Sequence, residues 1–374
     1  MPLPQEVATV SAGGMTYGGW TSVQIFRRYG DVISHMTLEV AENSGGGPGG
    51  AAVQLMPGMQ ATGSLGGELA ISGQVCVRQV SYDKETHSTQ IIVASNTMAL
   101  NASTVDGVPG FYQNYTLQQI AAAVTGKVGV GFQIMGAPAG ADKVFPRVSE
   151  HIGETRFAFI SRLANMRNLF LRDDGMGTLV ATRGVTGTVA TLNEGGANRN
   201  ILAAQLTLRN DEYGNPARTV GDNFAGSQTT IDDNAARDVS ATVTSPNMPA
   251  KTPQTVGMPQ PGDNQDAAMY AARVAAWNLA QYIEGVITVP GWFIDSGALW
   301  LDQVGGLVTI NSPTLVPGGQ IVLALKGVIS LQDNENGTIT KLEVCGTGSL
   351  GALGQGQSTS GLNVPLMGTA QPGQ

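Results

Sequence analysis

The sequence is poor in the side chains that enzymes and metal sites use. It holds three histidines and two cysteines, and charged residues make up only 13% of it. His35, His87 and His151 each stand alone, so neither a metal site nor a Ser/His catalytic pair is indicated. Cys76 and Cys345 are too few for a secreted disulfide scaffold. Both lie in strand-like runs, where buried free thiols are expected.

Aromatic residues are also scarce, at 6%, and too scattered to form a strip on which sugars or bases would stack. No apolar run reaches the roughly 18 residues of a membrane span. No signal peptide opens the chain, which predicts that the protein is made in the cytoplasm. The net charge of −8 argues against nucleic-acid binding, because phosphate contacts need Lys and Arg. An acidic wall would let DNA slide past without sticking, although plain solubility explains the same charge.

Glycine is abundant instead, with 51 residues. Because glycine lowers helix stability, a glycine-rich and weakly charged chain favours a β-rich fold with many turns over a helical bundle. Apolar and polar residues alternate over Val23–Ile25 and over Met36–Val40, and this period of two predicts half-buried antiparallel strands. The sequence therefore predicts a mainly β protein.

Two long hairpins are predicted, one in each half of the chain. The first runs from Gln74–Ser81 across a polar turn to Gln90–Ala94. The second runs from Val328–Ser330 to Thr340–Val344, with Asn336-Gly337 as a strong turn signal. Their likeness indicates an internal duplication, although hairpins are common enough that coincidence explains the pattern equally well.

Residues 109–190 differ from the rest, because two helices are predicted there, each followed by a strand. The first helix is expected to begin after Thr116, its N-cap, and to end near Val124. The second is expected from about Glu154 to Leu169. This pattern predicts a small α+β unit between two β segments.

The sequence divides into four expected parts. They are a first β domain at 1–108, an α+β insertion at 109–190, a second β domain at 191–346 and a flexible tail at 347–374. The second β domain is expected to contain a helix from Asp266 to Glu284 and a long loop around Ser245–Asp263. The Gly-, Ser- and Gln-rich tail cannot bury enough apolar surface to fold alone.

No motif in the sequence indicates catalysis. It contains no Walker loop, metalloprotease helix motif or zinc pattern. Phe293–Ala298 looks like the active-site turn of aspartic proteases, but that chemistry needs two carboxylates and the turn occurs once. Asp295 is therefore expected to bond its own backbone, and Glu154 to cap a helix. We predict no catalytic, cofactor-binding or metal-binding residue.

The most demanding local sequence is Val289–Trp300, which holds two tryptophans, two glycines and a proline. It follows the predicted helix, so a tightly packed helix-to-strand junction is expected there. Further segments stand with it in a characteristic order: Tyr17–Trp20 with Val23, Ile25 and Arg27, Gly153–Thr155 with Phe157, Ile160 and Leu163, Gly177–Val180, Asn200–Leu202, Gly226–Gln228, Ala272–Trp277 and Gly291–Trp300. Over roughly residues 10–346 this order resembles the central baseplate hub proteins of Mu-like contractile-tailed phages.

The resemblance implies a homotrimer. Each chain would carry two β-barrels similar to tail-tube subunits, so that three chains form a pseudo-six-fold ring. Such a hub, similar to the hub of type VI secretion spikes, joins the six-fold tail tube above to the three-fold central spike below. The tape measure protein and baseplate wedge components are further implied partners. DNA would pass through the lumen without specific binding, and the expected location is the virion tail baseplate.

The same resemblance implies a structural protein with no enzyme activity and no cofactor. The loop Gly45–Gly67, the stretch Ser245–Gly262 and the C-terminal tail depart from the family pattern. Two other functions stay open. One is a tail-associated hydrolase, either an aspartic-type protease or a cell-wall hydrolase, although no carboxylate pair at lysozyme-like spacing is present. The other is a β-rich adhesin or carbohydrate-binding module, which would need exposed aromatic side chains.

Overall fold

The computed structural model of the chain forms two compact units, and the chain passes between them several times. The first unit contains Met1–Arg183, Val289–Val304 and Gly327–Leu342, and the second contains Gly184–Thr288, Gly305–Lys326 and Glu343–Gln374. The structure describes residues 6–41, 54–82, 87–136, 138, 140–167, 169–182, 187–209, 217–221, 239–243, 253–257, 268, 270–272, 274–275, 278, 283–316, 318–333, 335 and 337–347.

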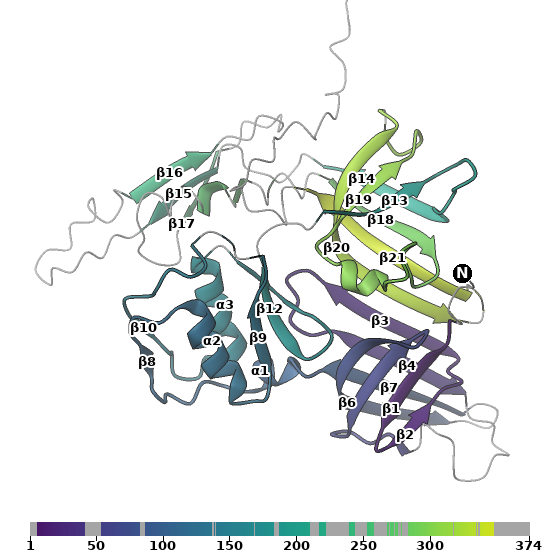
Figure 1. Cartoon of the computed structure of the whole chain (residues 1–374), viewed down its shortest axis with the longest axis horizontal. Helices are drawn as coiled ribbons and strands as arrows, with labels where there is room; N and C mark the ends of the chain where they lie inside the picture. The colour runs from purple at the N-terminus through teal and green to yellow at the C-terminus, as the bar shows by residue number, and fades with distance from the viewer. Residues whose placement is uncertain are drawn as a thin grey trace, which may run out of the picture. The chain divides into compact units, whose positions relative to one another are not determined.

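The first β module opens the chain (Figure 1). Its strands are β1 (Ala8–Ala12), β2 (Met15–Tyr17), β3 (Ser22–Arg28), β4 (His35–Ala41), β5 (Gln60–Leu65), β6 (Glu68–Tyr82) and β7 (His87–Ser95). They pair antiparallel in the order β3-β4-β7-β6-β5-β1-β2. Buried residues alternate with more exposed ones along β3, where Val23, Ile25 and Arg27 are buried, and Met36 and Leu38 are buried in β4, so the predicted alternation over these strands is confirmed.

One detail of this module differs from expectation. The predicted loop Gly45–Gly67 contains a strand, β5, within its described part, which begins at residue 54. The small residues of β5 do not give the apolar alternation by which a strand is recognised in a sequence. Gly63 is required there because an added Cβ would overlap Met36 and Ile71.

The α+β module follows β7. Its elements are α1 (Met98–Ala102), β8 (Phe111–Tyr112), α2 (Leu117–Gly126), β9 (Gly131–Ile134), β10 (Val148–Ser149), α3 (Arg156–Met166), β11 (Phe170–Asp173) and β12 (Thr178–Thr182). Strand β12 pairs parallel with β9 and antiparallel with β11, and α2 and α3 lie against this small sheet (Figure 1). Leu117, Ile120, Phe159 and Leu163 are fully buried in its core.

Both predicted helices of this module are present, with their starts where the sequence places them. Thr116 caps α2 in a capping box with Gln119, and Thr155 caps α3 by accepting a hydrogen bond from the Ala158 amide. Helix α3 ends at Met166 rather than at Leu169, because the Arg167 and Leu169 amides both bond back to the Ala164 carbonyl and close the helix.

The second β module contains β13 (Thr188–Asn193), β14 (Ala203–Leu208), β18 (Ile283–Pro290), β19 (Leu307–Asn311), β20 (Gln320–Asp333) and β21 (Gly337–Gly346). The strand order is β14-β18-β21-β20, with β19 beside the first part of β20 and β13 parallel to β19. A separate sheet, β16-β15-β17, is formed by β15 (Ala217–Gly221), β16 (Val239–Val243) and β17 (Gln254–Gly257). A 3-10 helix, η3 (Trp300–Gln303), precedes β19.

Two predictions for this region need correction. The helix expected to end at Glu284 stops earlier, because Ile283 already begins β18 and pairs with Leu208 of β14. Its described residues up to position 278 are helical, but Trp277 lies outside the described residues. Strand β17 falls inside the loop predicted around Ser245–Asp263, most of which also lies outside the described residues. The tail beyond residue 347 is likewise not described.

The two β modules share one strand order. In the first module, successive strands β3, β4, β5, β6 and β7 pair in the order β3-β4-β7-β6-β5. In the second, successive strands β14, β18, β19, β20 and β21 pair in the order β14-β18-β21-β20-β19. The small sheet β16-β15-β17 is inserted between β14 and β18, where the first module has a short turn. The internal duplication that the two hairpins indicated is therefore present in the topology.

Candidate functional site

The residues that the sequence offered for catalysis are not brought together. Asp295 is exposed in a turn that backbone bonds close, from the Gly297 amide to the Ile294 carbonyl and from the Ile294 amide to the Ala298 carbonyl. Within the described residues, no group of three or more His, Cys, Asp or Glu side chains could hold a metal ion. None of the described helices is long and apolar enough to span a membrane. No disulfide joins Cys76 to Cys345.

Glu154 was predicted to cap the start of a helix, but its carboxylate binds a side chain of that helix, Arg162. Thr155 makes the cap of α3, whereas the Glu154 carboxylate accepts hydrogen bonds from Arg162 at 3.1 and 3.2 Å. Burial alone would raise the pKa of Glu154, but the bonds from Arg162 and from the His151 amide outweigh it and lower the pKa. A carboxylate held ionised in this way is a poor general acid.

The Val289–Trp300 segment is a packed turn between β18 and η3, so it joins a strand to a 3-10 helix rather than a helix to a strand. Trp292 is fully buried, and its indole N–H donates to the Leu331 carbonyl at 3.1 Å. Gly291 has a φ of +71°, and its carbonyl accepts a 2.6 Å hydrogen bond from the Thr340 hydroxyl. This turn fixes the end of β18 against β20 and β21.

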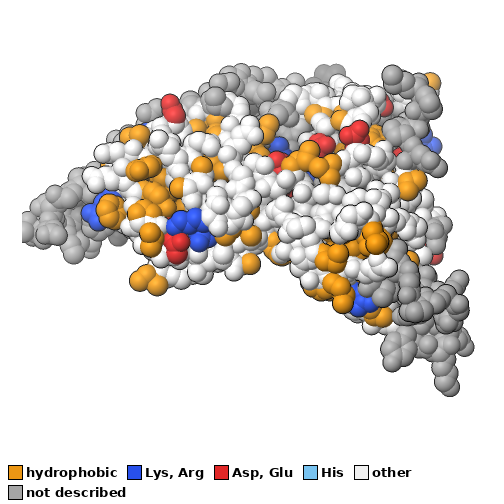
Figure 2. All heavy atoms as spheres, turned by 60° about the horizontal axis from the view of Figure 1, so that its bottom comes forward, with side chains coloured by type: hydrophobic (Ala, Val, Ile, Leu, Met, Phe, Trp, Pro, Cys, Tyr) orange, Lys and Arg blue, Asp and Glu red, His pale blue; other side chains and the backbone are white. Residues whose placement is uncertain are grey.

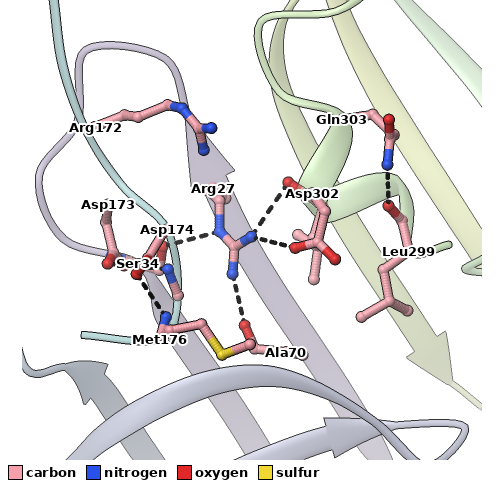
Figure 3. Close-up of polar contacts among 12 residues, drawn as sticks. Arg27, Ser34, Ala70, Arg172, Asp173, Asp174, Met176, Leu299, Asp302 and Gln303 are labelled. Carbon is pink, nitrogen blue, oxygen red and sulfur yellow. Dashed lines mark hydrogen bonds and ion pairs between the residues drawn. The ribbon is translucent and has the colours of Figure 1, made fainter. Parts of the chain in front are cut away.

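Arg27 is the most deeply buried charged group among the described residues with an ion pair, at 2% side-chain exposure (Figure 3). Its Nη1 donates to Asp302 Oδ1 at 2.8 Å and to the Leu301 carbonyl at 3.3 Å, and its Nη2 donates to the Ala70 carbonyl at 2.6 Å. A buried guanidinium costs free energy unless its donors are satisfied. Here they tie β3 to β6 and to η3.

A turn of the α+β module, at Asp173–Gly175, also packs against Arg27. The Gly175 carbonyl accepts a 2.6 Å hydrogen bond from the Ser72 amide, and a Cβ added to Gly175 would overlap the Arg27 guanidinium. Buried Asp173 accepts from the amides of Gly175 and of Ser34 at 3.0 and 3.3 Å. We call Arg27, Ala70, Asp173, Gly175 and Asp302 the Arg27 cluster.

The electrostatics of the Arg27 cluster favour a structural role. Burial lowers the pKa of neighbouring Arg172, and the positive charge of Arg27 lowers it further, while Tyr29, Asp174 and Asp302 oppose this. Every donor and carboxylate described above is used within the protein. The arrangement can hold the α+β module against the first β module, and its half-exposed carboxylate, Asp302, is paired with Arg27.

The sequence contained one sign of this cluster. Val23, Ile25 and Arg27 are alternate residues on the buried face of β3, so an arginine stands at a position where the pattern predicts an apolar residue. Sequence reasoning assigned Arg27 no role, and it missed Asp302 and Gly175. These residues are 275 and 148 positions away, and only the tertiary fold brings them to Arg27.

The surface carries few charges. On the face shown in Figure 2, Lys and Arg side chains occur in small separate groups and not as a continuous basic stripe. That face fits the net charge of −8 and does not resemble a nucleic-acid interface.

Each of the two N-terminal modules matches a known family. Residues 7–92 match the N-terminal domain of the Mu phage baseplate assembly protein GpP-like family. Residues 99–183 match the second domain of the gp44-like baseplate hub proteins. The baseplate hub protein gp44 of Escherichia phage Mu is 23% identical over 334 residues, which cover 88% of this chain and 85% of that protein.

Two solved structures share the fold. A 43 kDa tail protein of prophage MuSo2 from Shewanella oneidensis aligns with a TM-score of 0.77 and 22% identity, covering 92% of this chain and all of that chain. A component of the type VI secretion system of E. coli aligns with a TM-score of 0.54 and 10% identity, covering 90% of this chain and 76% of that chain. The likeness to a type VI component agrees with the resemblance found in the sequence.

Proposed function

We propose that this chain is a phage-tail baseplate hub protein of the Mu gp44 type and that it works as a homotrimeric adaptor between tail tube and central spike. As a homotrimer it offers the tube six β modules and the spike three-fold symmetry. The conclusion rests most heavily on the shared strand order of its two β modules. A single chain that repeats one module lets a three-fold assembly imitate a six-fold one.

We propose that the inner wall of this ring is acidic or neutral. Three chains carry three times the −8 of one chain, or −24. Acidic residues on the wall would repel the phosphates of passing DNA and keep it from adhering. The tape measure protein and DNA would then pass through the lumen without specific contacts, and wedge components would contact the outside of the ring.

A structural role without bond chemistry fits the described residues best. The Arg27 cluster and the turn at Gly291–Trp292 are used to hold modules and strands together. We further propose that residues 1–108 and 191–346 act as two tube-like domains and that residues 109–190 form an insertion between them. The hydrolase alternative has exposed Asp295 as its only aspartic-type candidate, and the adhesin alternative has no comparable support.

The assembly is tested by light scattering and by electron microscopy of the purified full-length chain. We expect a mass three times the 38.7 kDa of one chain, and end-on views with a central hole and six similar lobes. A monomer at every concentration, or a closed particle without a hole, would overturn the proposal.

The adaptor role is tested by mixing this ring with tail-tube protein and with the spike trimer from the same phage. We expect one hub trimer to bind the spike and to nucleate tube growth from its opposite side. The matched control is the tube protein without the hub. If the hub neither binds the spike nor shortens the lag of tube assembly, the adaptor function is wrong.

A further inference from the structure

In the first compact unit, one sheet edge is closed by a strand from the second repeat. Residues 327–333 of β20 pair antiparallel with β3, from Gly327 opposite Arg28 to Asp333 opposite Ser22. The preceding residues of β20, Gln320–Ala324, pair with β19 of their own module. Strand β20 therefore uses its first half within its module and its second half to reach the other one.

The counterpart of β3 in the second module, β14, has no such neighbour in the described part of the chain. It pairs with β18 on one side, and no described strand pairs with its other side. On β3, the inward residues Val23, Ile25 and Arg27 are at most 2% exposed. On β14 every residue is exposed or half-exposed, and Leu208 reaches 44%. The edge of this strand is thus covered by β20 in the first module, and in the second module no described strand covers it.

The counterpart of β20 in the first module, β6, is open in the matching half. Its first half, Glu68–Gln74, pairs with β5, as the first half of β20 pairs with β19. Its second half, Val77–Tyr82, pairs with β7 and with no other described strand. Val77 and Val80 there are 41% and 38% exposed. An open edge with exposed apolar side chains invites pairing with another strand, and proteins usually protect such edges.

We propose that a second copy of this chain closes both edges, with the second half of β6 of one copy pairing antiparallel with β14 of the next. This contact repeats between chains the pairing that β20 and β3 make within one chain. A second copy is the favoured occupant because it carries the matching strands. Strand β6 corresponds to β20, and β14 corresponds to β3, which β20 covers within one chain. The contact joins different surfaces of the two copies, and such head-to-tail contacts form a ring when the rotation from one copy to the next closes. It rests on the proposed trimer and names the strands that hold it.

Charged substitutions at the two edges test this pairing. Val80→Lys and Leu208→Lys each place a charge on an exposed edge residue, where folding tolerates it and strand pairing does not. We expect each variant to lose the trimer and to scatter light as a single 38.7 kDa chain, with an unchanged circular dichroism spectrum. Val108→Lys is the matched control. Val108 is 66% exposed but lies between α1 and β8, outside both β6 and β14, and this variant is expected to stay trimeric.

Cross-linking provides a second measurement that does not depend on weakened assembly. In a Cys76→Ser and Cys345→Ser background, Val80→Cys is combined in turn with Ala204→Cys, Leu206→Cys or Leu208→Cys, which share one face of β14. At least one combination is expected to form interchain disulfides on oxidation, whereas Val80→Cys with Thr62→Cys is expected to form none.

The outcomes separate this inference from the proposed function. If the wild-type chain is trimeric but both lysine variants stay trimeric and no cysteine combination cross-links, the edge pairing is wrong and the trimeric hub stands. If the lysine variants are trimeric and fail only to bind the tail-tube protein, the edges belong to the tube and the inference is again wrong. If the wild-type chain is a monomer throughout, the inference and the proposed trimer fall together.

Discussion

At the scale of single residues, the Arg27 cluster shows how one buried charge can join segments distant in the sequence. Arg27 is acceptable in the core because backbone carbonyls and Asp302 take up its donors. Gly175 is acceptable beside it because a glycine leaves room for the guanidinium and adopts a φ of +78°. Many glycines meet one of these two requirements, the space beside a neighbour or the positive φ. Gly175 must meet both, so a larger residue is not tolerated at this position.

Gly175→Ala is predicted to destabilise the protein more than Gly153→Ala does. Both glycines have a left-handed φ, of +78° and +83°, so both substitutions meet the same backbone strain, about 1 kcal/mol. Only at Gly175 does the added Cβ also overlap Arg27, which raises the expected loss to about 3 kcal/mol. Urea unfolding measures both. Equal losses in the two variants would show that the overlap has no energetic weight.

At the scale of secondary-structure elements, local signals and tertiary contacts contribute differently. The starts of α2 and α3 follow from Thr116 and Thr155, because a cap satisfies backbone amides through its own side chain. The start of β18 does not follow from local preference. A helical pattern runs up to residue 284, but pairing with β14 makes Ile283 the first residue of a strand.

The ion pair between Glu154 and Arg162 on α3 predicts a specific dependence of stability on pH. The pKa of Glu154 is lower in the folded protein than the 4.5 of a free side chain. Its contribution to stability is therefore present above pH 4.5 and is lost as the pH falls through the lowered pKa. Glu154→Gln is expected to lower the free energy of unfolding by about 0.5–1 kcal/mol at pH 7. At a pH below the lowered pKa of Glu154, the substitution is expected to have no effect.

Thermal unfolding between pH 7 and pH 3 measures this difference. Exposed Glu68→Gln is the control, since Glu68 has no described ion pair and its substitution is expected to leave the curve unchanged. A Glu154→Gln variant whose deficit stays constant across the whole pH range would contradict the assignment of the ion pair.

At the scale of the whole molecule, two repeats and one insertion divide the tasks. The Arg27 cluster holds the insertion to the first repeat, and in the proposed trimer the two repeats supply the surfaces of the ring. Low charge and an acidic balance suit the proposed passage of DNA through that ring, because adhesion would need clustered Lys and Arg.

The assembled protein is predicted to bind no double-stranded DNA at physiological salt. The charge of −8 for each chain repels phosphates, and no continuous basic surface is visible on the face in Figure 2. Gel-shift titration with a short duplex measures this, with a basic DNA-binding protein as a positive control. Retention of the duplex at micromolar protein would contradict the proposed acidic or neutral wall.

The sequence by itself determined the β-rich class, the α+β insertion, the Thr116 cap and the presence of two similar hairpins. Each depends on neighbours within about ten residues, where periodicity, caps and turn residues act. It also placed the chain near Mu-like hub proteins through the order of several short segments.

Only the tertiary structure decided the rest. The shared strand order, the strand β5 with its small residues, and the meeting of Arg27 with Gly175 and Asp302 all depend on contacts between segments far apart in the chain. The physical reason is that these features come from close packing and from hydrogen bonds between separate strands. A linear pattern records which residues could take part in such contacts, but the fold selects their partners.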